Sequence, residues 1–396
     1  MSAEIRREDL ETWADYLLDH SLGGVSPDDV VMIKGERITW PLMSILQDKV
    51  FAAGAIADLN LVAPDNDRGK VWGASIARHG TVAQIERVPS WQKARYEAMT
   101  KYVEVLGAEH PELFTGLPEE TAKAVMRVDE TYKNLRLLKP WVITLFPTQA
   151  FADLEEMSLE DYSRVIVSAS VTDPRLLAEV EAPIYAKMSA SKKVRIVTEH
   201  PRTHKTLELT MSIAGRNVIQ CTGKRNFPDG EVFTSPDARS VEGEIFVDMP
   251  VFYAGTTIQG VHLSFRGGVI KSYSAEKGGG ALEKIIETDE GSHRLGEVAL
   301  GMNAGIEKVL RHPLFVEKVG GTLHIAIGAS YPECYVDDPA SEEGRTGAER
   351  FFEEGSLNRS AQHVDIVTDF RGGGVGRAVY LDDTRLKVEN NIWVVP

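Results

Sequence analysis

Cysteine is scarce in this sequence of 396 residues, which contains it only at Cys221 and Cys334. Two cysteines cannot build a disulfide framework, and the chain has no Cys-x-x-Cys pair to hold a zinc ion. Long apolar runs are missing as well, because no stretch approaches the roughly 18 apolar residues of a membrane-spanning helix. The first residues include acidic side chains and no apolar segment, which does not fit a secretory signal peptide. From these absences we expect a cytoplasmic protein.

Positive charge is also in short supply. The formal net charge is −15, from 44 Lys and Arg residues against 59 Asp and Glu residues. Nucleic-acid-binding proteins and proteins of anionic membrane surfaces need clustered Lys and Arg, so neither kind of partner is expected. Hydrophobic residues make up 43% of the chain and charged residues 26%, which is the balance of a globular protein with a sizeable core. A chain of this length is expected to form two domains.

The N-terminal half alternates between apolar runs and stretches of helical periodicity. Strands are expected over residues 29–35, 56–62 and 141–146, and helices over 8–20, 41–53, 91–106 and 119–138. Residues 161–170 fit either a helix or a strand. Strands that alternate with helices predict an α/β domain around a largely parallel sheet. This half has no glycine-rich phosphate-binding loop and no recognisable catalytic constellation.

The pattern changes near residue 190. Beyond it, short segments alternate apolar and polar residues, as antiparallel strands do, at 193–198, 207–211, 244–247, 257–265 and 269–273. Gly267-Gly268 is placed for a hairpin turn between the last two. Short helices are expected over 281–287 and 305–310, and a mobile loop over the acidic, glycine-containing residues 337–355. We therefore expect an α/β N-terminal domain over residues 1–190, followed by a β-rich α+β catalytic domain over residues 191–396.

Two carboxylates in this second half stand at the start of short strands. Pro228-Asp229-Gly230 supplies a turn, and Val232-Phe233-Thr234 supplies β-branched and aromatic strand formers. Glu231 lies between them. Considered alone, a Glu in such a position is more often a solvated strand end than a functional group. Glu297 has the same setting, because it follows Gly296 and precedes an apolar strand.

Imidazole groups follow further along the chain. His363-Val364-Asp365 alternates on a predicted strand, so that His363 and Asp365 project from one face. Nitrogen and oxygen donors suit a first-row divalent metal, although a His-x-Asp pair also arises by chance. His324 lies in a mostly apolar strand, where a satisfied core His is more common than a ligand. Tyr331 ends that strand and could stabilise an oxyanion or simply pack. These groups suit two divalent ions that share an acid, and a metallohydrolase is one interpretation.

Several short motifs occur in a fixed order over roughly residues 215 to 370. They are Pro228-Asp229-Gly230-Glu231-Val232-Phe233-Thr234-Ser235-Pro236, Val241-Glu242-Gly243, Leu295-Gly296-Glu297-Val298-Ala299-Leu300-Gly301-Met302-Asn303, Gly321-Thr322-Leu323-His324-Ile325-Ala326-Ile327-Gly328 with Tyr331, and Asn358-Arg359-Ser360 with His363-Val364-Asp365. Together they resemble the aminopeptidase T family of metallo-aminopeptidases, which includes AmpS and PepS. The N-terminal half resembles this family only in its general pattern.

The resemblance implies a site for two divalent metal ions, which could be zinc, cobalt or manganese. The ligands that it implies are Glu231, Glu297, His324, His363 and Asp365, with Glu297 as the bridge. Tyr331 would stabilise the tetrahedral intermediate. Many members have an Asp-Glu-Asn-Ala run before the metal-binding His, whereas Val316-Glu317-Lys318-Val319 stands here, so Glu317 would be the acid of that run, as ligand or base. The resemblance also implies a homodimer.

The predicted function is that of a metal-dependent aminopeptidase, which releases N-terminal residues from short peptides by means of a metal-activated water. An alternative is a ring-cleaving dioxygenase of the dihydroxypyridine type, in which one iron would need only a subset such as His324, His363 and Asp365. Glu231 and Glu297 favour two metals over one. A third possibility is a metal-binding homologue without turnover. The metal content of the purified protein would separate the three.

Overall fold

The chain divides into two compact units, each with its own core. In the computed structural model, residues 5–63, 72–110, 113, 116–253, 256–306, 308–372 and 376–396 are described. The first unit is Met1–Pro174 with Gly223–Pro228, and the second is Arg175–Thr222 with Asp229–Pro396. This division differs from the expected boundary at residue 190. The helix that ends at Ala190 belongs with the second unit, since its Ile184 and Met188 are part of that unit's core.

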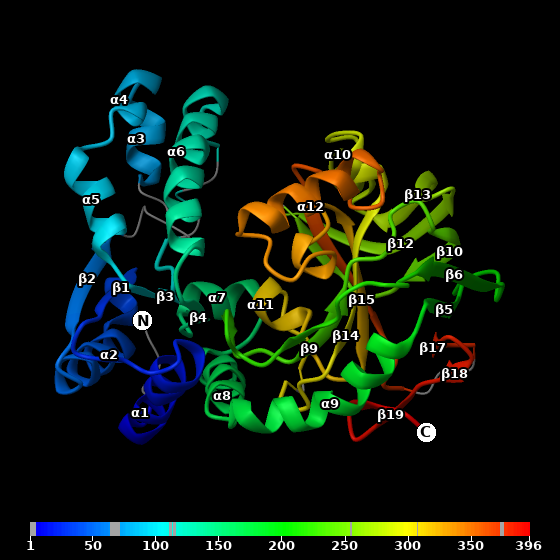
Figure 1. Ribbon diagram of the computed structural model, residues 1–396, viewed down its shortest axis with the longest axis horizontal. Helices are drawn as coiled ribbons and strands as arrows, with labels where there is room; N and C mark the ends of the chain where they lie inside the picture. The colour runs from blue at the N-terminus through cyan, green and yellow to red at the C-terminus, as the bar shows by residue number, and fades with distance from the viewer. Residues whose placement is uncertain are drawn as a thin grey trace. The chain divides into compact units, whose positions relative to one another are not determined.

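The first unit is built around a parallel sheet in the order β2-β1-β3-β4-β8 (Figure 1). Its strands are β1 (Val30–Glu36), β2 (Ile56–Val62), β3 (Lys101–Leu106), β4 (Trp141–Leu145) and β8 (Asn226–Phe227). Its helices are α1 (Arg7–Asp15), the π-helix η1 (Tyr16–Ser21), the 3₁₀ turn η2 (Arg37–Thr39), α2 (Trp40–Ala52), α3 (Ala74–His79), α4 (Val82–Glu86), α5 (Ser90–Ala98), α6 (Glu119–Leu137), α7 (Gln149–Leu154) and α8 (Leu159–Ser170). The predicted parallel α/β architecture is confirmed.

One prediction in this unit was wrong in part. Residues 91–106 were expected to form a single helix, but α5 ends at Ala98 and Lys101–Leu106 forms β3. β3 pairs with β1 on one side and β4 on the other, and Val103 and Val105 are buried there. Pairing on both edges of a strand rich in β-branched residues outweighs the helical periodicity of the sequence.

The ambiguous residues 161–170 are helical. Ser158 caps α8 by accepting a hydrogen bond from the backbone N–H of Asp161. Tyr162, Ile166 and Ala169 are buried, and their spacing places them along one face of the helix. Local capping and an apolar stripe therefore settle a segment that the sequence left open.

The second unit consists mainly of antiparallel strands. Its strands are β5 (Lys193–Glu199), β6 (Thr206–Ser212), β7 (Ile219–Cys221), β9 (Glu231–Thr234), β10 (Glu242–Val247), β11 (Val251–Tyr253), β12 (Thr256–Arg266), β13 (Val269–Lys277), β14 (Leu295–Gly301), β15 (Thr322–Gly328), β16 (His363–Asp369), β17 (Ala378–Leu381), β18 (Thr384–Arg385), β19 (Lys387–Glu389) and β20 (Ile392–Val394). Its helices are α9 (Pro174–Ala190), α10 (Gly279–Ile286), the 3₁₀ turns η4 (Gly291–His293) and η5 (Pro332–Cys334), α11 (Pro313–Val316) and α12 (Glu342–Glu353). The β-rich α+β character predicted for this half is confirmed.

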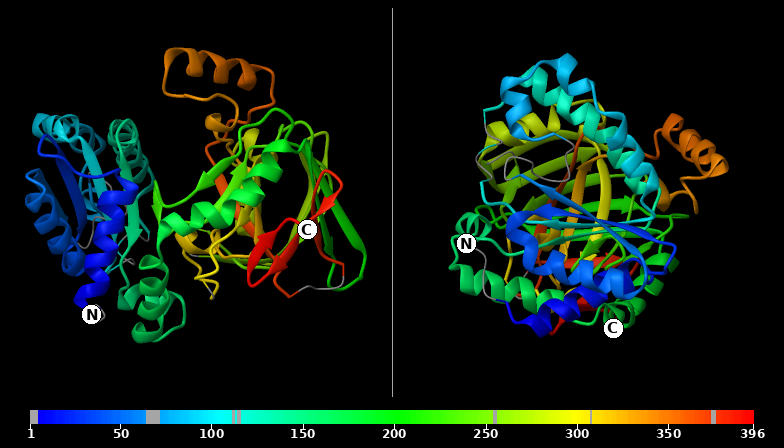
Figure 2. Two further views of the ribbon diagram at one scale, coloured as in Figure 1. Left: turned by 60° about the horizontal axis from the view of Figure 1, so that its bottom comes forward. Right: turned by 90° about the vertical axis from the view of Figure 1, so that its left-hand side faces the viewer.

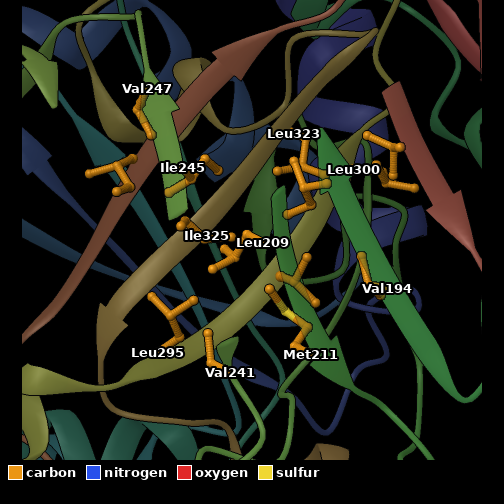
Figure 3. Close-up of a cluster of buried hydrophobic side chains, with 14 of the residues drawn as sticks. Val194, Leu209, Met211, Val241, Ile245, Val247, Leu295, Leu300, Leu323 and Ile325 are labelled. Atoms are coloured by element: carbon orange, nitrogen blue, oxygen red, sulfur yellow. The ribbon is translucent and has the colours of Figure 1, made fainter. Parts of the chain in front are cut away.

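Two antiparallel sheets enclose the core of this unit. One runs in the order β11-β12-β10-β6-β5-β17-β18 with β13 paired to β12, and the other in the order β16-β15-β14-β9-β7. The shared apolar cluster draws on both sheets: Leu209 and Ile245 come from the first, and Leu300, Leu323 and Ile325 from the second (Figure 3). The β16-β15-β14-β9-β7 sheet thus has one face in the core, which leaves its other face for polar groups.

Other predictions for the second unit met mixed outcomes. The hairpin at Gly267-Gly268 is present, because β12 and β13 pair in antiparallel register on either side of it. Residues 337–355 were expected to be a mobile loop, but they contain α12 (Figure 2, orange). This helix is capped by Ser341 and packs Phe351 against Tyr335. No helix forms in the described part of residues 305–310, where Asn303 accepts a hydrogen bond from the backbone of Gly305; residue 307 lies outside the described residues.

None of the helices in the part of the chain that the structure describes has both the length and the apolar character needed to cross a membrane.

Candidate metal centre

The β16-β15-β14-β9-β7 sheet gathers the predicted ligands on the face that points away from the core. Glu297 of β14 pairs with Ala326 of β15, which in turn pairs with Asp365 of β16. Paired residues share a face, and so do residues two apart along a strand, which adds His324 and His363 to this row. The residues at the alternate positions of these strands, such as Val298 and Ile325, point into the core.

Small residues separate the ligands on this face. Ala299 lies between Phe233 and His324 in the register, and Ala326 lies between Glu297 and Asp365. Gly301 is opposite Glu231, and Gly328 is opposite His363. Because Ala and Gly rise little above the sheet, the longer side chains can converge over them. The alternation of small residues with apolar ones is a further signal of this site in the sequence.

A tight turn sets the position of Glu231, which is 6% exposed at the start of β9. Gly230 precedes it with φ +134°, a conformation that side-chain-bearing residues rarely adopt. A Cβ on Gly230 would lie 2.7 Å from the Cβ of Asn303. The side-chain amide of Asn303 donates a 2.6 Å hydrogen bond to the carbonyl of Asp229, which ties the turn to the end of β14. Glu231 is therefore a buried group and not a solvated strand end.

The predicted ligands form two donor groups that share Glu297. Glu231, Glu297 and His324 place donor atoms within 4.8 Å of one another, and so do Glu297, His363 and Asp365. Nε2 of His324 lies 3.4 Å from Oε2 of Glu231, 3.7 Å from Oε1 of Glu297 and 3.9 Å from Oδ1 of Asp365. Nε2 of His363 lies 3.0 Å from Oε2 of Glu297. The structure thus brings all five predicted ligands together.

Charge is concentrated in this site and shifts the pKa values of its members. Burial lowers the pKa of His324, but the nearby carboxylates of Glu297 and Glu231 outweigh it and raise that pKa to about 9. Burial likewise opposes the charge on His363, yet Asp365 and Glu297 raise its pKa to about 12. The pKa of Asp365 is lowered, because the imidazole of His363, 3.5 Å from its Oδ1, outweighs the effect of burial. Without a metal, both imidazoles are therefore in the doubly protonated, positively charged form at neutral pH.

Two carboxylate oxygens in the site fit a bound cation. Oε2 of Glu231 and Oδ1 of Asp365 are buried and have no hydrogen-bond partner among the described residues. Both face Nε2 of His324. Buried carboxylate oxygens are costly to leave unpaired, and carboxylate with imidazole is the donor set of divalent first-row metals. The residues present therefore fit a metal centre.

The second nitrogen of His363 is fixed by the backbone. Nδ1 donates a 2.8 Å hydrogen bond to the carbonyl of Ala329, which directs Nε2 toward Glu297. The hydroxyl of Tyr331 lies 3.3 Å from the same Nε2, and its ring packs edge-on against His363 and Phe233. Burial, followed by the charge of Glu297, raises the pKa of Tyr331, so its phenol keeps its proton. Tyr331 thus lies beside the donor groups with its phenol proton in place.

Glu317 lies beside the ligands and is not a member of either donor group. Its Oε2 is 3.2 Å from Nζ of Lys318, and burial, followed by the charge of Asp365, raises its pKa well above the usual range. Lys318 itself is 1% exposed and contacts Glu231 directly. Nothing in the sequence singles out Lys318 as a member of the site, because a Lys after α11 gives no sign that its side chain turns inward.

The model of the thermophilic metalloprotease family, M29, matches residues 6–372. The chain belongs to this family. The resemblance to the aminopeptidase T group is confirmed, and with it a metal-dependent protease as the class of enzyme. The family match extends across both units of the fold, including the N-terminal half, where the sequence showed only a general likeness.

Two curated relatives match this chain over most of its length. Aminopeptidase T of Thermus aquaticus is 29% identical over 72% of this chain and 74% of its own length. Aminopeptidase PepS of Streptococcus thermophilus is 24% identical over 98% of both chains.

Two solved structures share the fold. Wild-type AmpT from Thermus thermophilus aligns with a TM-score of 0.73 and 22% identity over 98% of this chain and 100% of its own. The 2,5-dihydroxypyridine dioxygenase of Pseudomonas putida KT2440 aligns over 99% of both chains, with a TM-score of 0.57 and 11% identity. Proteins with this fold thus catalyse two different kinds of reaction, and the function has to be inferred from the residues of the site.

Proposed function

We propose that this chain is an aminopeptidase that releases N-terminal residues from short peptides and uses two divalent ions, which could be zinc, cobalt or manganese. Its place among the metal-dependent aminopeptidases follows from the family and from relatives with that activity in their names. One observation supports two ions in particular. The two oxygens of Glu297 face different imidazoles, with Oε1 toward His324 and Oε2 toward His363. A carboxylate in that position can bridge two metals.

Each ion would have its own set of ligands besides Glu297. Glu231 and His324 would hold one ion, and His363 and Asp365 the other. When bound, such ions lower the pKa of a shared water and polarise a scissile carbonyl. The chain's part is to hold the five donors in place, which the sheet register and the backbone hydrogen bond of His363 do.

Two further side chains would act on the substrate. Tyr331, whose phenol remains protonated, would donate a hydrogen bond to the carbonyl oxygen as negative charge develops on it. Glu317 would act as the proton carrier and not as a ligand, because it lies outside both donor groups and its raised pKa suits a general acid at neutral pH. The peptide amine that leaves needs a proton, and a carboxyl group can supply it.

A cytoplasmic location and a homodimer are also part of this proposal. The cytoplasmic location rests on sequence composition, and the homodimer on the resemblance to the family. Size-exclusion chromatography with light scattering would test the dimer, for which we expect about twice the mass of the chain.

The test of the proposed activity uses the purified, metal-free chain. When zinc, cobalt or manganese is added, the chain should bind two ions and again release leucine from leucyl peptides, and a chelator should stop this release.

The dioxygenase alternative has some geometric support, because His324 and His363 lie 3.9 Å and 3.5 Å from the same oxygen of Asp365. It predicts one iron per chain, oxygen consumption with a dihydroxypyridine, and no peptide cleavage. That result would overturn the proposal.

A further inference from the structure

Lys318 is a buried cation at the edge of the metal centre. It follows α11 in the turn that leads to β15, and its backbone is held on both sides. Its N–H donates a 3.1 Å hydrogen bond to the carbonyl of Phe315, and its carbonyl accepts a 3.0 Å bond from the N–H of Asn303. The side chain is 2% exposed. Its position is therefore set by the backbone, and the ammonium group has no room to turn toward solvent.

Three carboxyl groups surround this ammonium group. Nζ contacts Oε1 of Glu231, lies 3.2 Å from Oε2 of Glu317 and lies 3.7 Å from Oδ1 of Asp229. Cys221, Asp229 and Glu231 also place donor atoms within 4.8 Å of one another, as a third metal site would. Lys318 already supplies positive charge to two members of that group. The cation of this pocket is thus a lysine, and we assign no third metal to it.

The two carboxylate oxygens of Glu231 face different groups. Oε1 is bound to the ammonium group, and Oε2 faces His324 without a hydrogen-bond partner among the described residues. Lys318 therefore orients Glu231 and at the same time withdraws part of its negative charge. The other donor group differs, since no ion pair of a Lys or Arg with Glu297 or Asp365 is found in the part of the chain that the structure describes.

We propose that Lys318 makes the two metal positions unequal. The position formed by Glu297, His363 and Asp365 holds its ion tightly, and the position formed by Glu231, Glu297 and His324 holds an exchangeable ion. The reason is electrostatic, because a fixed ammonium group on Glu231, which is a ligand of that position alone, repels a divalent ion in a buried site. This inference rests on the proposed two-ion function. Lys318 is thus a positioning residue. Because it weakens the binding of one ion, the concentration of free metal determines whether both metal positions are filled.

The test is a calorimetric titration of the metal-free chain with Co²⁺. The wild-type protein should bind in two steps, with dissociation constants at least about tenfold apart, as one added charge at a few ångströms implies. Lys318→Met keeps the length of the side chain and removes its charge, so the weaker step should tighten by about tenfold or more. Lys318→Arg keeps the charge and should keep the two steps apart. Lys34→Met removes another ammonium that is 1% exposed, in the first unit, and should leave both steps unchanged.

Each outcome decides for or against the inference. Unchanged steps in Lys318→Met, or loss of its weaker step, would overturn it. If the wild-type chain binds only one ion at saturation, the two-ion function fails, and the role of Lys318 then stands only if Lys318→Met binds a second ion. Lys318→Met combined with Asp229→Asn removes one charge of each sign and covers the case in which the single variant does not fold. The double variant should show the same tightening, and its absence would also overturn the proposal.

Discussion

Glu297 of β14 and His363 of β16 meet over the intervening strand β15 with Oε2 and Nε2 3.0 Å apart, while the other oxygen of Glu297 faces His324 at 3.7 Å. One carboxylate thus joins the two donor groups. Every step of the proposed function depends on this arrangement, so the first prediction changes Glu297 itself.

Glu297→Gln should abolish peptide cleavage with little loss of folding. The amide keeps the shape of the side chain and removes the charge that would bridge two ions, so the bound metal should fall below two ions per chain. Elemental analysis and turnover of a leucyl substrate would measure both effects. Glu283→Gln, on the exposed face of α10, is the matched control and should retain metal and activity. A fully active Glu297→Gln enzyme would remove Glu297 from the mechanism.

Tyr331→Phe should lower kcat by roughly 10²–10³-fold and change KM much less, because the lost hydrogen bond forms mainly in the transition state. The control is Tyr335→Phe. The hydroxyl of Tyr335 donates to backbone carbonyls of Pro236 and Ser356, so its loss should lower the unfolding free energy by about 1 kcal/mol and leave kcat near the wild-type value. If kcat is the same in both variants, Tyr331 has only a packing role.

Metal uptake should release protons at neutral pH. His324 and His363, with pKa values raised to about 9 and about 12, are protonated in the metal-free chain and must lose those protons to bind a metal through Nε2. The apparent affinity should therefore rise as pH increases from 7 toward 9, since protons compete less as the pH approaches the pKa of His324. Calorimetry in two buffers of different ionisation enthalpy measures the protons released. Equal enthalpies in both buffers would contradict the pKa values.

Gly230→Ala should destabilise the turn before β9 and weaken metal binding at Glu231. The backbone there has φ +134°, and the new Cβ would clash with Asn303, which suggests a cost of roughly 1–3 kcal/mol. Gly215→Ala is the control, because φ is +68° there and no atom lies within 4 Å of the added Cβ. Urea unfolding compares the two variants. Equal losses of stability would show that the contact with Asn303 does not matter.

The sequence was most informative where the signals are local. A two-residue period places His363 and Asp365 on one face, and a glycine directly precedes both Glu231 and Glu297, although Gly296 lies within β14 and not before it. It was least informative where distant segments decide the outcome. Residues 101–106 form a strand because β1 and β4 flank them, and residues 223–228 return to the first unit through the pairing of β8 with β4.

Lys318 shows the same limit within the site. A Lys is almost always expected at the surface, and only the fold reveals that Glu231, Glu317 and Asp229 surround it. Its burial depends on contacts between residues about ninety positions apart in the sequence, and no periodicity reports such a contact.

The most direct test of the account is a comparison of two substrates by the metal-loaded enzyme. A leucyl peptide with a free N-terminal amine and the same peptide with that amine acetylated differ in one charge and in bulk at the end that an aminopeptidase must recognise. The account predicts that the free peptide loses one residue at a time and that the acetylated peptide resists cleavage. Equal cleavage of both peptides would contradict the assignment, even if two metal ions are bound.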